Sequence, residues 1–135
     1  GEKKEKVNME VLNKIKDRNI GLYIRKENYN ENLLTGYGRL QWLKHELEEH
    51  KGGVKLYIDE YGSVLMFSEL MSDIKDGEIE GLLLWSIEDI RPNLIVSLGL
   101  ECENMKIPIV SFCESYEWIN ELVENQKSFK DKNVG

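Results

Sequence analysis

Residues 79–87 read IEGLLLWSI, and this stretch decides the fold. Its nearly unbroken apolar run lies between the turn residue Gly77 and the acidic pair Glu88 and Asp89. A short apolar run with such boundaries is typical of a central strand that is buried on both faces of a sheet. The sequence therefore predicts a sheet that is covered by a helical layer on each side.

Segments with strand-like and helix-like patterns alternate on both sides of this run. Strands are predicted at 19–25, 54–59, 79–87 and 106–112, and helices at 39–50, 64–77, 92–105 and 116–126. Strict alternation of this kind favours a mostly parallel sheet of four to five strands with right-handed crossovers. The expected fold is therefore a three-layer α/β/α domain with this sheet in the middle.

One candidate boundary interrupts the chain, near residue 18. Residues 1–18 are expected to form an N-terminal helical extension or linker, residues 19–126 the α/β domain, and residues 127–135 a tail. The chain of 135 residues is long enough for one domain of ordinary size.

Composition and charge exclude several classes of protein. A hydrophobic share of 41% is too high for a disordered tail, and the longest apolar run is far short of a membrane span. The net charge of −7 repels a phosphate backbone. Two isolated cysteines fit a reduced compartment better than a disulfide framework. We therefore expect a cytoplasmic domain without membrane contact, whose access to DNA would need a larger assembly or a missing domain.

Acidic side chains gather where the predicted strands end: Glu27, Asp59, Glu60, Glu88, Asp89 and Glu114. Because the carboxyl ends of parallel strands meet at one edge of a sheet, these side chains are expected to converge. Converging carboxylates can hold Mg²⁺ and support phosphoryl chemistry, and the candidate ligands are Glu27, Asp59, Glu88 and Asp89. The commoner interpretation is that polar residues simply accumulate in loops, in which case the chain holds no metal.

Other motifs carry little chemistry. The stretch HELEEH at 45–50 resembles a zinc-protease motif, but its histidines are five positions apart and face different sides of a helix. Gly36-Tyr37-Gly38 lacks the third glycine of a dinucleotide fingerprint. No cofactor and no small-molecule substrate is predicted from these residues.

Four segments of the chain follow a familiar order: NIGLYIRKEN (19–28), LYIDEYGS (56–63), FSELMSDIKDGEIEGLLLWSIEDIRPN (67–93) and LECENMKIPIVSFCES (100–115). This order resembles the catalytic domain of the serine recombinases, which include resolvases, invertases and phage-type integrases. The resemblance implies a resolvase-like fold that makes protein–protein contacts. In that family a serine cuts DNA and becomes covalently attached to the 5′ phosphate.

Seven positions correspond to catalytic motifs of the family: Tyr23, Arg25, Glu27, Asp59, Glu88, Asp89 and Pro92. The family begins Y-x-R-x-S, and here Glu27 stands where the nucleophilic serine is expected. Where the family carries D-R-L-x-R, Asp89 and Pro92 replace the two arginines. Arg91 lies one position from the second of them.

These departures have a direct chemical consequence. Phosphoryl transfer without a metal needs a nucleophile and a group of guanidiniums that hold the phosphate oxygens. Carboxylates at two of these positions would repel the phosphate. We therefore expect a catalytically inactive domain without a cofactor, which acts on a protein partner or as a homo-oligomer. Two alternatives remain: a Mg²⁺-dependent phosphoryl-transfer enzyme that uses the strand-end carboxylates, and an active recombinase domain whose motifs lie in a shifted register.

Overall fold

The computed structural model describes residues 12–34 and 38–114, so predictions for 2–11, 36–37, 116–126 and 127–135 lie outside the described residues. Four strands form one sheet in the order β2-β1-β3-β4: β1 (Ile20–Arg25), β2 (Val54–Asp59), β3 (Gly81–Leu84) and β4 (Ile109–Ser111). Every neighbouring pair is parallel, which confirms the parallel sheet that the alternating pattern predicts.

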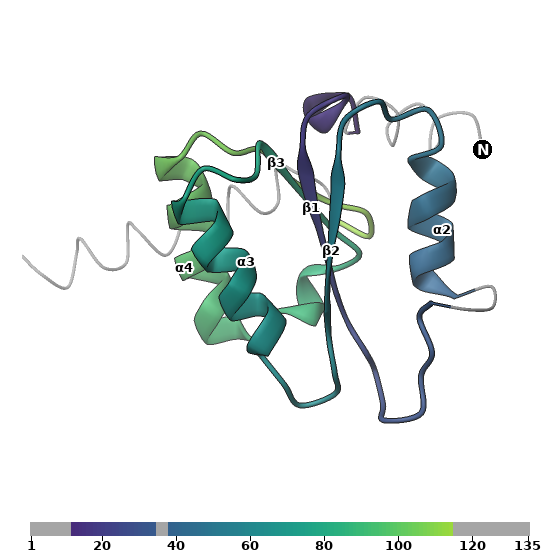
Figure 1. Cartoon of the computed structure of the whole chain (residues 1–135). Coiled ribbons are helices and arrows are strands. Elements are labelled where there is room, and N and C mark those ends of the chain that lie inside the picture. Colours follow the sequence, from purple (N-terminus) through teal and green to yellow (C-terminus); the bar gives the residue numbers. More distant parts are fainter. Residues whose placement is uncertain (1–11, 35–37, 115–135) are drawn as a thin grey trace, which may run out of the picture.

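Helices cover both faces of this sheet. Their bounds are α2 (Arg39–Glu46), α3 (Leu65–Lys75) and α4 (Pro92–Asn104), with short 3-10 turns at η1 (Asn13–Ile15) and η2 (Ile87–Asp89). In Figure 1, α3 and α4 lie on one side of the strands and α2 lies on the other. The predicted α/β/α layering is therefore confirmed. No helix within residues 12–34 and 38–114 is long and apolar enough to cross a membrane.

The alternation of side chains along each strand divides the core into two clusters. Tyr23, Tyr57, Leu82 and Leu84 point to the face that α3 and α4 cover. Leu22, Ile24, Leu83 and Val110 point to the opposite face, where they pack with Ile15, Leu40 and Leu43. Both faces of β1 and β3 are therefore buried, as the apolar run at 79–87 predicts.

Several element ends differ from the prediction, and β4 is shorter at both ends than the predicted strand at 106–112. β3 ends at Leu84, because the Ser86 hydroxyl accepts a hydrogen bond from the Glu88 amide (3.1 Å) and starts η2 instead. Helix α2 ends at Glu46, four residues early. Residues 13–15 form a 3-10 turn where an α-helix was predicted. In contrast, Gly77 ends α3 as expected, since its φ of 75° favours glycine.

Residues before β1 pack closely on the domain. Ile15 is buried in the core, and the Lys51 amide donates to the Asp17 carboxylate (2.9 Å). Gly52 is required here, because a Cβ at this position would lie 2.1 Å from the Arg18 carbonyl oxygen. The described part of the segment 1–18 is thus joined to the turn that leads into β2.

Candidate functional site

The candidate site lies at the carboxyl ends of β1 and β2. These strands end at Arg25 and Asp59, which are partners in the parallel register. The loop after β1 leads to Arg39, the first residue of α2, and Asp89 ends the η2 turn beyond β3. The strand-end residues that the sequence singles out thus come from several elements that meet at one edge of the sheet.

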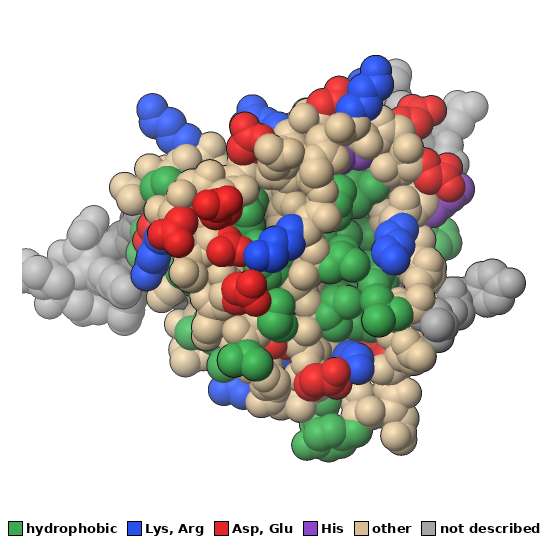
Figure 2. All heavy atoms as spheres, in the orientation of Figure 1, with side chains coloured by type: hydrophobic (Ala, Val, Ile, Leu, Met, Phe, Trp, Pro, Cys, Tyr) green, Lys and Arg blue, Asp and Glu red, His purple; other side chains and the backbone are tan. Residues whose placement is uncertain are grey.

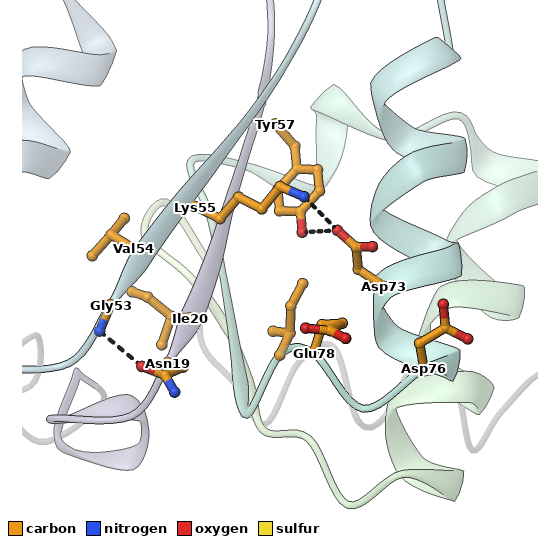
Figure 3. A pocket seen from close by; sticks show the side chains of 10 residues that line it. Asn19, Ile20, Gly53, Val54, Lys55, Tyr57, Asp73, Asp76 and Glu78 are labelled. Carbon is orange, nitrogen blue, oxygen red and sulfur yellow. Dashed lines mark hydrogen bonds and ion pairs between the residues drawn. The ribbon is translucent and has the colours of Figure 1, made fainter.

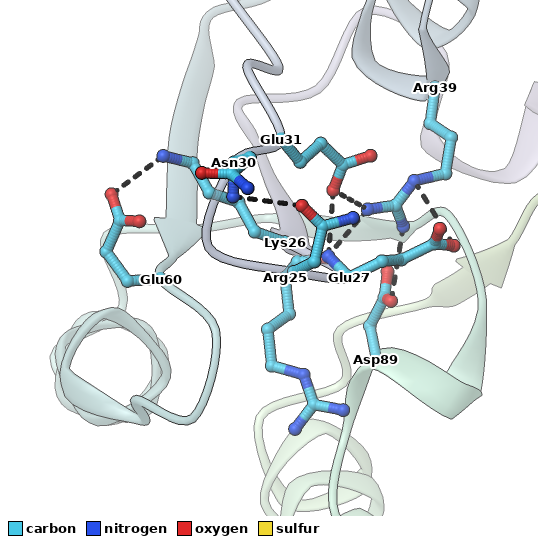
Figure 4. A network of polar contacts seen from close by, with 9 residues as sticks. Arg25, Lys26, Glu27, Asn30, Glu31, Arg39, Glu60 and Asp89 are labelled. Atoms are coloured by element: carbon cyan, nitrogen blue, oxygen red, sulfur yellow. Dashed lines mark hydrogen bonds and ion pairs between the residues drawn. The ribbon is translucent and has the colours of Figure 1, made fainter.

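Arg39 is the centre of a polar network at this edge (Figure 4). Its Nη2 donates to Glu31 Oε1 (2.7 Å) and to the Arg25 carbonyl oxygen (2.8 Å). Its Nη1 donates to Asp89 Oδ1 (3.3 Å), and its Nε lies 3.7 Å from Glu27 Oε1. The Arg39 side chain is 12% exposed, so one nearly buried guanidinium joins β1, the following loop and η2.

The position of Arg39 is unusual for a cation. It lies in the first turn of α2, which contains no acidic residue, and the helix dipole disfavours a positive charge there. The surrounding carboxylates offset this cost. Burial acts to raise the pKa of Glu31, but hydrogen bonds from Arg39 and from the Glu27 amide (2.8 Å) outweigh it and hold that pKa below its usual value.

Asp89 is the most perturbed carboxyl of the site. Burial raises its pKa to about 6, although Arg39 and Arg25 act in the opposite direction. Its Oδ2 has no hydrogen-bond partner among residues 12–34 and 38–114. A buried carboxylate with one unpaired oxygen is costly, so the Arg39 contact matters for the stability of the charged form.

Asp59 serves a different purpose at the same edge. It is 1% exposed and accepts a hydrogen bond from the Tyr23 hydroxyl (2.6 Å). It also accepts from the amides of Met66 (2.7 Å) and Phe67 (3.0 Å) at the start of α3. Burial and then the Asp59 carboxylate raise the pKa of Tyr23 far above its usual range. Both oxygens of Asp59 are therefore occupied by groups that fix β1 and α3.

The remaining predicted residues do not join this network through their side chains. Glu88 is exposed on η2, and Pro92 is the exposed first residue of α4. The half-buried Arg25 guanidinium points away from that of Arg39 in Figure 4 and forms no ion pair within the described ranges. Arg91 donates to the Gly62 carbonyl oxygen (3.2 Å) instead. The side chains of the seven predicted positions are thus divided among separate contacts at this edge and do not form one network.

Glu114 is the centre of a second group at this edge. Its carboxylate accepts hydrogen bonds from the hydroxyls of Ser86 (2.8 Å) and Ser111 (2.5 Å) and from the Ile87 amide (3.3 Å). Ser86 follows β3 and Ser111 ends β4, so this carboxylate joins the tips of two neighbouring strands. The sequence predicts that Glu114 lies at the strand ends, and there its carboxylate connects the end of β4 to the residues that follow β3.

A metal centre is not apparent in the part of the chain that is described. No group of three His, Cys, Asp or Glu side chains within residues 12–34 and 38–114 could hold a metal ion. The four candidate ligands are divided: Asp59 binds Tyr23 and α3, Glu27 and Asp89 face Arg39, and Glu88 is exposed.

Sequence reasoning missed two residues of the site, Arg39 and Glu31. A signal for Arg39 was present, since a basic residue at the start of a predicted helix opposes the helix dipole. A helix that follows a parallel strand also begins at the carboxyl edge of the sheet, which places Arg39 beside Arg25. Glu31 gave no such signal, because it lies in a polar loop whose path the sequence does not specify.

No protein-family model and no curated protein matches this chain.

Proposed function

We propose that this chain is a serine-recombinase-type α/β domain that has lost DNA-cleaving chemistry and acts through protein association. The parallel α/β/α architecture and the order of the strand-end motifs support this proposal. The observation that carries it is the charge of the edge: Arg39 is already shared by Glu27, Glu31 and Asp89.

The network makes binding of a phosphodiester unfavourable. A phosphate at this edge would meet Glu27 at the position where the resemblance expects a serine nucleophile. To reach Arg39 it would have to displace Glu31 and Asp89, and the carboxylates left behind would lose their counter-charge. Arg25 alone cannot replace a group of preorganised guanidiniums around the transferred phosphate.

The surface around this edge favours a protein partner instead. Four large hydrophobic side chains lie exposed in the loops there or at the start of α3: Tyr29, Leu34, Tyr61 and Leu65. Tyr29 is 77% exposed, and its ring packs edge-on against that of Tyr61 at a centroid distance of 4.9 Å. Exposed aromatic groups of this kind are typical of protein interfaces.

The finer features of the proposal follow from the same reasoning. The domain works in the cytoplasm with a protein partner or as a homo-oligomer. It reaches DNA only through a larger assembly or a further domain. It uses no cofactor and no small-molecule substrate.

A cleavage assay with a restored nucleophile tests the loss of chemistry. The chain and its Glu27→Ser variant are each incubated with supercoiled plasmid and quenched with detergent. We expect neither nicked DNA nor covalent protein–DNA adduct from either protein, because the serine alone does not supply the missing guanidiniums. Gel electrophoresis of the quenched samples gives the readout.

Two other results of this assay would overturn the proposal. An adduct formed by the unaltered chain and abolished by one serine substitution would favour the active recombinase in a shifted register. Nicking that needs Mg²⁺ would favour the metal-dependent enzyme. In that case Mg²⁺ would also raise the melting temperature of the chain, and Glu27→Gln and Asp59→Asn would abolish this rise.

Photo-crosslinking tests the association. A benzophenone amino acid replaces Tyr29 or Leu65 at the carboxyl edge, or Lys75 at the opposite end of α3 as the control. On irradiation in cells, we expect a discrete crosslinked protein species from Tyr29 and Leu65, and at least about tenfold less from Lys75. Equal, diffuse labelling from all three positions would count against a specific protein partner.

A further inference from the structure

In the part of the chain that the structure describes, the outer edge of β2 is open. Among residues 12–34 and 38–114, β2 pairs only with β1, and it ends the sheet order. The carbonyls of Gly53 and Asp59 accept hydrogen bonds from Ile20 (2.9 Å) and Lys26 (3.0 Å) on the β1 side. Because successive residues of a strand direct these groups to opposite sides, the N–H and C=O of Val54, Leu56 and Ile58 point outward. A further strand could therefore pair along β2.

The side of β2 that faces α2 is apolar. Leu56 and Ile58 pack partly against the core cluster on that face and remain half-buried, and Val54 is 42% exposed. Figure 2 shows hydrophobic side chains as a band between the charged surface of α3 and helix α2. This strip offers contacts for alternate apolar residues of a strand that pairs with β2.

The other side of β2 is polar and acidic. Lys55 Nζ binds Glu69 (3.2 Å) and Asp73 (2.8 Å), and the Tyr57 hydroxyl donates to Asp73 (2.5 Å). Lys55, Tyr57 and Asp73 border a pocket of about 460 Å³ at the amino end of the strand (Figure 3). The pocket is lined by Asn19, Ile20, Gly53, Val54, Lys55, Tyr57, Asp73, Asp76, Glu78 and Ile79.

The charges that line this pocket do not balance. Asp73, Asp76 and Glu78 supply three carboxylates, and Lys55 is the single cation among the lining residues. Asp73 is paired with Lys55, whereas Asp76 and Glu78 form no ion pair within the described ranges. A positively charged group that entered beside Val54 would therefore find two carboxylates available.

We infer that the edge of β2 binds an extended segment of a protein partner in which apolar residues alternate with Lys or Arg. Side chains of such a strand point alternately to the two faces of the sheet. The apolar set would contact Val54, Leu56 and Ile58, and a basic side chain would enter the pocket toward Asp76 and Glu78. Main-chain hydrogen bonds would supply affinity, and the pocket and apolar strip would supply specificity.

A second copy of the chain fits this surface poorly. Its net charge is −7, and the α3 side of the edge is acidic, so two copies would bring like charges together. The strand that a second copy would offer, β2 itself, carries Lys55 as its one basic residue, and Lys55 is already bound to Glu69 and Asp73. Charge complementarity therefore favours a basic partner.

A synthetic peptide tests this inference. The probe is a fluorescently labelled peptide of about eight residues in which Val or Ile alternates with Lys or Arg. We expect saturable binding by fluorescence anisotropy, weakened about tenfold when Asp76→Asn and Glu78→Gln are combined. A matched peptide with Glu in place of each basic residue is expected not to bind. Because Asp76 and Glu78 are exposed, these substitutions are not expected to disturb the fold.

N-methylation of the peptide separates strand pairing from simple charge attraction. Methyl groups on one alternating set of amides would block hydrogen bonds to β2, and methyl groups on the other set would point to solvent. We expect one methylated peptide to lose at least about tenfold in affinity while the other keeps its affinity. Equal affinity of both, or no binding of the unmethylated probe, overturns the inference.

One further result would show that a second copy of the chain, and not a basic segment of a partner, binds the edge of β2. Val54→Pro removes an outward N–H at the first residue of β2, a position that tolerates proline. If sedimentation shows that the chain dimerises and that Val54→Pro abolishes the dimer, the occupant is a second copy. The inference goes beyond the proposed function and uses a different surface, so its failure leaves the crosslinking result at Tyr29 and Leu65 unaffected.

Discussion

Replacement of Asp59 by alanine is expected to lower the free energy of unfolding by about 3–5 kcal/mol. The variant loses hydrogen bonds from the Tyr23 hydroxyl and from the amides of Met66 and Phe67. It leaves the buried hydroxyl without its acceptor and the first turn of α3 without its cap. Urea unfolding followed by circular dichroism measures the change, and a marginal domain could fail to fold at all.

A milder substitution keeps this prediction testable. Tyr23→Phe removes the hydroxyl and leaves the two amide contacts of Asp59, so a loss of about 1–2 kcal/mol is expected. Glu60→Ala, which changes the exposed neighbouring carboxylate, should cost no more than about 0.5 kcal/mol. If Asp59→Ala were no more harmful than Glu60→Ala, the capping role assigned to Asp59 would be wrong.

Replacement of Arg39 by methionine is expected to cost about 3 kcal/mol at neutral pH, because it removes the hydrogen bonds to Glu31 and to the Arg25 carbonyl oxygen and leaves the buried Asp89 carboxylate without its nearest counter-charge. The pKa of Asp89 is already raised to about 6 by burial. Because this pKa is higher than that of a free carboxyl group, protonation of Asp89 stabilises the folded state. This stabilisation is fully present below the usual carboxyl pKa and is lost as the pH rises through about 6. The deficit of Arg39→Met should consequently shrink when the pH falls to about 5.

A second substitution identifies the cause of that deficit. Asp89→Asn removes the buried charge, so combining it with Arg39→Met should recover the pH-dependent part of the deficit, about 1–2 kcal/mol at pH 7. Unfolding curves of the four proteins at several pH values give the coupling between the two positions. An Arg39→Met deficit that stayed constant across this pH range would show that Asp89 does not cause it.

The fold could be predicted from the sequence because its signals are strong and local. The run at 79–87 is apolar almost throughout, which only a strand buried on both faces explains well. The element ends were less predictable. The Ser86 hydroxyl ends β3 by accepting a hydrogen bond from Glu88, and this competition between side chain and strand leaves no trace in hydrophobic periodicity.

The candidate site was predictable only in part. The alternation of strands and helices along the sequence was enough to predict that four residues lie at one edge of the sheet: Arg25, Glu27, Asp59 and Asp89. It could not show which of them meet, because that depends on Arg39, whose contact with Asp89 spans 50 positions of sequence. Of the carboxylates that the metal alternative groups together, Glu27 and Asp89 lie against Arg39, and Asp59 accepts hydrogen bonds from the amides at the start of α3.

The strand order β2-β1-β3-β4 constrains how the domain is completed during its synthesis on the ribosome. β1 and β2 can pair once residue 59 has emerged, but the other edge of β1 has no partner until Gly81–Leu84 follow. Throughout that interval β1 offers a row of unsatisfied peptide groups beside an apolar surface. Slow translation between these two points would therefore expose the nascent chain to pairing with its neighbours on the same messenger RNA.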